Sequence, residues 1–96
     1  MDTKWYTSEQ AVKMKSGLLK FVRVAGEYRF CEVIGTNHSD LVKQGEKALS
    51  AGMIVLYEDS FKFMDRWSMT LKIGVDKYDH ERLEMLFGRK YRFEYE

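Results

Sequence analysis

The sequence predicts a single small α+β domain over residues 1–96, with a mixed β-sheet flanked by two main helices. Three observations predict this class. Short runs of β-branched and aromatic residues recur along the chain. Segments with helical periodicity fall between these runs. Hydrophobic residues make up 45% of the chain, which is enough for one packed core without a disulfide or a metal. The expected order of the core elements is β-β-α-β-β-α-β.

The segment before residue 18 is predicted as a short N-terminal helix. Thr7 and Gln10 have the spacing of a capping box, which places this helix from about residue 8 to residue 15. Val12 and Met14 alternate as they would in a strand, so a strand is the alternative for the same residues.

Two apolar runs then predict a β-hairpin. Residues 18–24 and 28–34 are rich in β-branched and aromatic side chains, and a turn at Gly26 joins them. Both faces of the first run are largely apolar, so we expect this strand in the middle of the sheet, covered on both sides. Lys20 lies midway along it.

The middle of the chain predicts a helix followed by a buried strand. Apolar residues fall on one side of a helix over residues 39–52, which Gly52 would end. His38 lies at the start of this helix, where unpaired N–H groups attract an anion and disfavour a protonated imidazole. Residues 53–57 are almost continuously apolar and predict a buried strand.

Two more strands are expected after a turn at residues 58–60. Residues 61–63 form the first, and a bend at Asp65 and Arg66 separates it from the second. In the second, residues 67–73, every other side chain is apolar, which is typical of a half-buried strand.

The C-terminal part predicts a helix and a last strand. Asp76 and Asp79 mark the start of a helix over residues 76–87, and Gly88 ends it. Residues 91–95 alternate as a strand, which could be an edge open to a second copy of the chain.

The charge and the cysteine content indicate which kinds of partner and which cellular compartment to expect. The chain has 16 Lys and Arg against 15 Asp and Glu, a net charge of +1, so we expect no nucleic-acid partner. A single cysteine cannot form an internal disulfide, which indicates a reducing compartment. No apolar stretch approaches the roughly 18 residues of a membrane span, so we expect a cytoplasmic protein with no membrane partner.

The element order and three landmarks resemble the phosphohistidine phosphatase (Janus/Ocnus) family. "LLKFVRV" is similar to that family's F-K-Y-V-L-I-R-V strand and has Lys20 at the lysine position. "HSDL" is similar to its H-A-D-I helix start, with His38 at the histidine position, and "DRWSM" is similar to Y-G-Y-S-M, with Ser68 and Met69 in place. The resemblance spans about residues 18–95. Where the family has a Gly-Gly-Gly-Arg stretch, this chain has "YEDSFKF".

This resemblance implies metal-independent phosphoryl hydrolysis or phosphate binding, with no cofactor. His38 would be the catalytic base or a transient phosphoryl acceptor, and Lys20 would contact the phosphoryl oxygens. Backbone N–H groups of Ser68, Met69 and Thr70 would stabilise the developing charge. The implied partner is a phosphorylated protein or a small anion.

The same residues also have purely structural interpretations. His38 would then be a loop histidine beside a helix cap, Lys20 would extend to a sheet edge, and Ser68 and Thr70 would face outward from an amphipathic strand. The competing function is a non-catalytic small-ligand-binding protein, or a homodimer or larger homo-oligomer, on the same scaffold. The cysteine and the two histidines do not have the spacing of metal ligands, so we predict no metal site.

Overall fold

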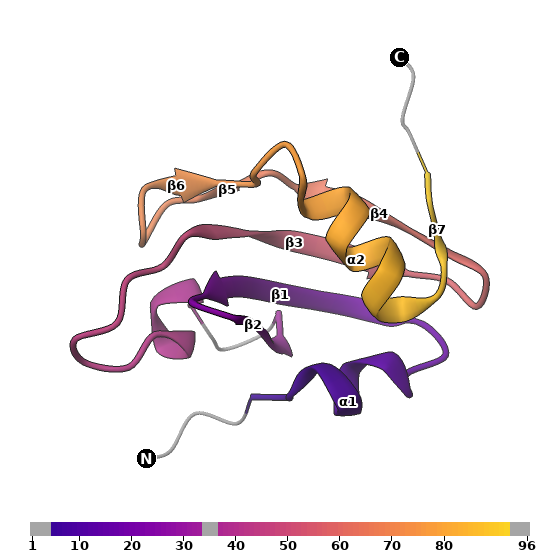
Figure 1. Cartoon of the computed structure of the whole chain (residues 1–96), viewed down its shortest axis with the longest axis horizontal. Helices are drawn as coiled ribbons and strands as arrows, with labels where there is room; N and C mark the ends of the chain where they lie inside the picture. The colour runs from indigo at the N-terminus through magenta and orange to yellow at the C-terminus, as the bar shows by residue number, and fades with distance from the viewer. Residues whose placement is uncertain (1–4, 34–36, 93–96) are drawn as a thin grey trace.

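A five-stranded sheet forms the centre of the fold in the computed structural model, which describes residues 5–33 and 37–92 (Figure 1). The elements in chain order are α1 (Ser8–Val12), β1 (Gly17–Val24), β2 (Glu27–Glu32), the 3-10 helix η1 (His38–Leu41), β3 (Ser50–Leu56), β4 (Ser60–Asp65), β5 (Trp67–Ser68), β6 (Ile73–Gly74), α2 (Asp79–Phe87) and β7 (Lys90–Tyr91). The α+β class is thereby confirmed.

The sheet has the strand order β2-β1-β3-β4-β7. The β1–β2, β1–β3 and β3–β4 pairs are antiparallel, while β4 and β7 are parallel, so the sheet is mixed as predicted. β1 has a neighbour on each side, and Phe21 lies between Phe30 of β2 and Gly52 of β3. The outer edge of β2 is extended by Tyr6, whose backbone exchanges two hydrogen bonds with Phe30.

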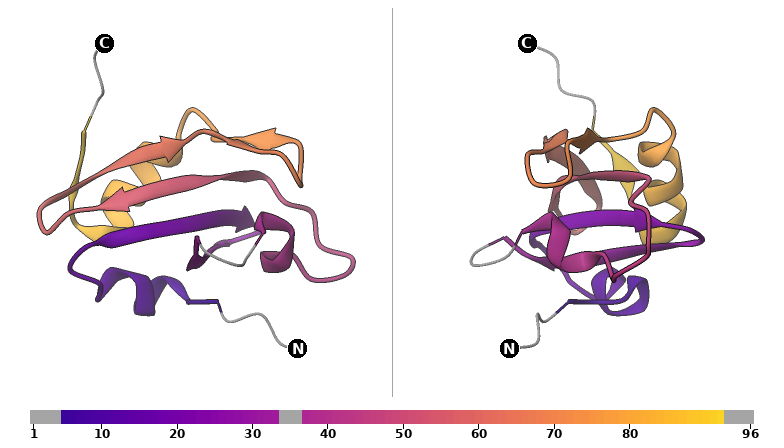
Figure 2. Two further views of the ribbon diagram at one scale, coloured as in Figure 1. Left: turned by 180° about the vertical axis from the view of Figure 1, so that it is seen from behind. Right: turned by 90° about the vertical axis from the view of Figure 1, so that its left-hand side faces the viewer.

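Both helices pack on one face of the sheet and build the main core there. α2 crosses in front of the strands in Figure 1, and the strands lie in front of α2 when the molecule is seen from behind (Figure 2). The buried residues of this core are Ala11, Leu19, Phe21, Tyr28, Phe30, Ile54, Leu56, Phe61, Phe63, Leu83, Phe87 and Tyr91. The ring of Phe87 lies 5.6 Å from that of Phe30 and 6.0 Å from that of Phe61, between centroids, so aromatic packing fixes α2 against the sheet.

The opposite face, which we call the open face, is only partly covered. A smaller core of Val22, Val24, Cys31, Leu41 and Ala51 lies at one end of it. There η1, the following loop and the β5–β6 hairpin pack over the strands through partly buried side chains. The candidate site lies on this face, beside the covering segments.

The predicted helix over residues 39–52 is wrong, because only the single 3-10 turn η1 forms in this region. Gly45 has a left-handed φ of 87°, which interrupts a right-handed helix. Residues 50–52 instead extend β3 toward the N-terminus, where they pair with β1. Arg29 makes two hydrogen bonds with the Glu46 carboxylate, at 2.6 and 2.7 Å, and these hold the intervening loop against the sheet.

The predicted strand over residues 67–73 is also wrong, because this segment folds back on itself as the hairpin β5–β6. The N–H of Lys72 donates to the carbonyl oxygen of Ser68 at 2.8 Å and closes the turn, and Lys72 has a φ of 56°. The expected bend at Asp65 and Arg66 is present, since β4 ends at Asp65.

The local signals at the helix ends are present, although α1 ends at Val12, before the predicted residue 15, and α2 begins at Asp79, after the predicted residue 76. Thr7 and Gln10 form the expected capping box at α1. At α2, the Asp79 carboxylate accepts the N–H of Asp76 at 2.8 Å, and Gly88 ends the helix with a φ of 65°. The last strand is observed as β7, which begins at Lys90 and ends at Tyr91. Residues 93–95 of the predicted run 91–95 lie outside the described residues, as does residue 34 of the run 28–34. Within residues 5–33 and 37–92, no helix is long and apolar enough to cross a membrane.

Candidate functional site

A hollow of about 230 Å³ on the open face brings together four of the five predicted site residues. Its lining residues are Lys20, Asn37, His38, Met53, Asp65, Trp67, Met69 and Thr70. They come from β1, η1 and its cap, β3, the end of β4 and the β5–β6 hairpin. Segments that are distant in the sequence thus converge on one open concave surface, which we call the His38 hollow.

His38 is held in one orientation by a hydrogen bond to β3. The side chain is only 7% exposed, and its Nε2 lies 2.7 Å from the carbonyl oxygen of Gly52. A carbonyl oxygen can only accept, so Nε2 carries the proton in this arrangement. In the neutral ring, Nδ1 therefore keeps its lone pair, and this nitrogen can act as a base or nucleophile.

The surroundings of His38 favour the neutral imidazole. Burial lowers the pKa of His38 below its ordinary value of 6.5, and the nearby charge of Lys20 lowers it further. The hydrogen bond to Gly52 and the charge of Asp65 act in the opposite direction and are outweighed. We expected a neutral ring because of the field of a long helix, but burial is the main cause in the structure.

Gly52 allows the close approach that fixes His38. A Cβ atom at this position would lie 2.7 Å from Cγ2 of Val75, 2.9 Å from the carbonyl oxygen of Asp65 and 3.0 Å from Cε1 of Phe21. Only glycine leaves room for β3, β4 and the segment after β6 to pack this closely. Gly52 is therefore not the helix stop that its sequence context predicted, and a glycine inside a strand is a known signal of close packing.

Asp65 is the acidic residue that lines the hollow, and the sequence motifs did not predict it. It ends β4, and its carboxylate accepts the N–H of Trp67 at 3.0 Å. The hollow therefore contains one ammonium group, from Lys20, and one carboxylate, from Asp65. Lys20 projects into the hollow from the central strand β1, which differs from the structural interpretation of a lysine extending to a sheet edge.

The three residues predicted to supply backbone N–H groups have different positions. Met69 and Thr70 line the hollow, whereas Ser68 is fully buried behind it. The Ser68 hydroxyl accepts the N–H of Leu71 at 3.3 Å and lies 3.3 Å from the Thr70 hydroxyl oxygen. Ser68 thus shapes the β5–β6 turn that presents Met69 and Thr70. The structural interpretation, in which the Ser68 side chain faces outward, is therefore wrong.

Cys31 and His80, the other two residues of a metal-binding type discussed with His38, lie elsewhere. Cys31 is buried in the smaller core, and the His80 ring packs 5.1 Å from that of Tyr91, between centroids. Among the described residues, no three His, Cys, Asp or Glu side chains are grouped so that they could hold a metal ion.

Comparisons with protein-family models, curated proteins and solved structures gave no match to this chain. The resemblance to phosphohistidine phosphatases therefore stays a prediction, which depends on the short motifs around Lys20, His38 and Ser68. What the structure adds is the shared hollow in which two of these residues, Lys20 and His38, meet.

Proposed function

We propose that the His38 hollow binds a phosphoryl group, and that His38 transfers or hydrolyses it without a metal ion. The observation that carries this proposal is the position of the neutral His38 imidazole and the Lys20 ammonium group on one open hollow. A nucleophile or base with its lone pair available and a cation for the phosphoryl oxygens are the groups that such chemistry needs.

The polar lining suits an esterified or amidated phosphate better than a free dianion. Lys20 offers a positive charge, while Asn37 and Thr70 offer an amide and a hydroxyl donor. Asp65 adds a negative charge that repels a dianion, but its carboxylate can accept a hydrogen bond from an N–H or O–H of the ligand. A phosphoramidate, which carries an N–H next to phosphorus, satisfies both charges.

The proposed reaction uses the Nδ1 lone pair of His38 in one of two ways. As acceptor, Nδ1 forms a bond to phosphorus while the bond from phosphorus to the leaving nitrogen breaks and that nitrogen takes up a proton. Water then attacks phosphorus, the P–Nδ1 bond breaks, and phosphate leaves with the neutral ring restored. As base, Nδ1 takes a proton from a water that attacks phosphorus directly, the bond from phosphorus to the leaving nitrogen breaks, and that nitrogen takes the proton back from Nδ1. In both routes Nε2 keeps its hydrogen bond to Gly52.

One observation favours the alternative, in which the hollow holds an anion without turnover. The stretch that replaces the family's glycines, residues 57–63, forms the β3–β4 turn and the start of β4. Phe61 and Phe63 from this stretch are buried in the main core. No run of glycines is therefore available there for close backbone approach to a phosphate.

Hydrolysis of a phosphoramidate tests the catalytic proposal. Wild-type protein should release phosphate above the uncatalysed rate, and His38→Gln should lose about a hundredfold or more of that activity, as expected for removal of a base or nucleophile. His80→Gln is the matched control, since it changes the other histidine, which packs on Tyr91, and it should keep full activity. Equal rates for wild type and His38→Gln would leave only the binding alternative.

A further inference from the structure

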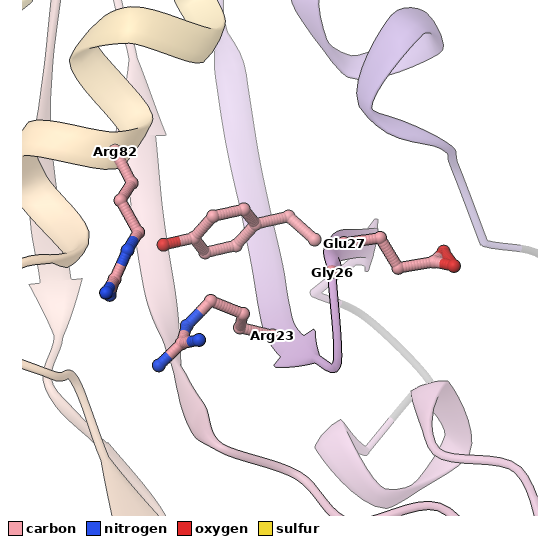
Figure 3. Close-up of a pocket in the computed structure, with 5 residues that line it drawn as sticks. Arg23, Gly26, Glu27 and Arg82 are labelled. Carbon is pink, nitrogen blue, oxygen red and sulfur yellow. The ribbon is translucent and has the colours of Figure 1, made fainter.

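A second hollow of about 230 Å³ lies between the β1–β2 turn and α2, and it shares no lining residue with the His38 hollow. It is lined by Arg23, Gly26, Glu27, Tyr28 and Arg82. Figure 3 shows the guanidinium groups of Arg23 and Arg82 turned toward the same space, while the carboxylate of Glu27 points away from it. We call this space the arginine hollow.

The two guanidinium groups have hydrogen-bonding capacity to spare. Their closest carboxylate contacts are ion pairs at 3.5 to 3.8 Å with Asp76 and Asp79, longer than ordinary N–H···O hydrogen bonds. Nε of Arg23 is buried and has no hydrogen-bond acceptor within residues 5–33 and 37–92. This Nε faces Oδ1 of Asp79 in the ion pair at 3.5 Å, so the donors open to an external acceptor are the terminal nitrogens of the two guanidinium groups.

The neighbouring carboxylates are already engaged elsewhere. Asp79 is fully buried and accepts hydrogen bonds from the Tyr28 hydroxyl and the Asp76 N–H. One oxygen of Asp76 accepts the N–H of Tyr78 at 2.8 Å. These acids balance the charge of the two arginines, but they do not fill their donor positions.

We infer that the arginine hollow binds the carboxylate group of a small monocarboxylate ligand. A guanidinium group presents paired N–H donors whose planar geometry matches the two oxygens of a carboxylate. Asp76 and Asp79 balance the charges of Arg23 and Arg82. Glu27 adds a further carboxylate, which is paired with Arg29, so a dianion is disfavoured relative to a single negative charge. This inference uses none of the residues of the proposed phosphoryl site, so each can fail without the other.

A titration with sodium propionate, replacing sodium chloride at constant ionic strength, tests the inference. The backbone amide signals of residues 26–28 and the Nε–H signal of Arg23 should shift and saturate. Arg82→Gln should weaken propionate binding about tenfold or more, the expected effect of losing charge-assisted hydrogen bonds. Arg92→Gln is the matched control, because Arg92 packs over Tyr57 away from this hollow, and it should bind like wild type. Inorganic phosphate should bind more weakly than propionate.

A second variant keeps the test decisive if Arg82→Gln does not fold. Asp76→Asn removes one balancing charge but keeps an oxygen for the Tyr78 N–H, and it should bind propionate several-fold more tightly. Shifts that rise linearly without saturation in wild type would overturn the inference. So would equal affinities in wild type, Arg82→Gln and Asp76→Asn, because the arginines would then have only a structural role.

Discussion

Nε2 of His38 lies 2.7 Å from the carbonyl oxygen of Gly52, so a single 3-10 turn on the open face is fixed to strand β3. The bond selects the ring tautomer and leaves Nδ1 with its lone pair. It also explains why an isolated turn of four residues can hold a buried imidazole in one place. Substitution of either His38 or Gly52 should therefore disturb the position of the imidazole in the hollow.

The depressed pKa of His38 makes stability depend on pH in the mildly acidic range. Since its folded pKa lies below 6.5, the unfolded chain binds a proton before the folded protein does as the pH falls. The free energy of unfolding should therefore decrease as the pH falls below about 6.5, by up to ~1.4 kcal/mol per pH unit. Urea unfolding between about pH 7.5 and pH 5, a range on both sides of the ordinary histidine pKa of about 6.5, measures this effect. The quantity to compare is the difference in unfolding free energy between wild type and His38→Gln at each pH. An unchanged slope in His38→Gln would contradict the assignment.

Gly52→Ala should destabilise the protein through crowding. The new Cβ would meet Val75 and the backbone oxygen of Asp65 at less than 3.0 Å, and backbone cannot move aside cheaply. Overpacking of this kind costs about 1–3 kcal/mol, which urea unfolding would show. Val55→Ala, at a half-buried position of the same strand, is the control and should cost less. A Gly52→Ala variant as stable as wild type would show that β3 and β4 do not pack this closely.

Tyr28→Phe should expose the dependence of buried Asp79 on its hydrogen-bond donors. The Tyr28 hydroxyl donates to the Asp79 carboxylate, which is fully buried at the start of α2. Removing that donor leaves a buried charge with one partner fewer, at a cost of about 1–3 kcal/mol. Thermal or urea unfolding measures the loss. Tyr78→Phe removes an exposed hydroxyl nearby and should change stability by no more than about 0.5 kcal/mol.

The pair of Arg29 and Glu46 should stabilise the protein only above acidic pH. The hydrogen bonds from Arg29, and then that from the Lys43 N–H, lower the pKa of Glu46 from 4.5 to about 2. Because the folded pKa is the lower one, this contribution is complete above pH 4.5 and is lost as the pH falls toward 2. Glu46→Gln should remove that part of the acid dependence, as measured by unfolding at stepped pH. Glu58→Gln, an exposed residue of the β3–β4 turn, should leave it in place.

The parts of the fold that depend on neighbouring residues in the sequence were predictable. The capping box of Thr7 and Gln10, the hairpin turn at Gly26 and the end of α2 at Gly88 are local signals, and each is present. The helix over residues 39–52 failed because its sequence pattern suited two structures. Residues 50–52 form a strand because they pair with β1, a contact between segments that are distant in the sequence.

The candidate site was predictable only in outline. Sequence motifs selected Lys20, His38, Met69 and Thr70, and the tertiary structure brings all four to one hollow. Asp65 could not be found in this way, because its position depends on where β4 ends relative to η1. Ser68 was assigned a place in the hollow but is buried, since the segment that contains it forms a hairpin where a continuous strand was expected.

The central claim, that the His38 hollow holds a phosphoryl group, is tested most directly by titrating the protein with phosphoramidate and following the ring nitrogens of His38 by NMR. We expect saturable shifts at His38 and Thr70, with about tenfold weaker binding in Lys20→Met. Lys62→Met is the control, since Lys62 lies on the neighbouring strand β4 outside the hollow, and it should bind like wild type. Shifts that do not saturate, or equal affinity in Lys20→Met and Lys62→Met, would contradict the claim.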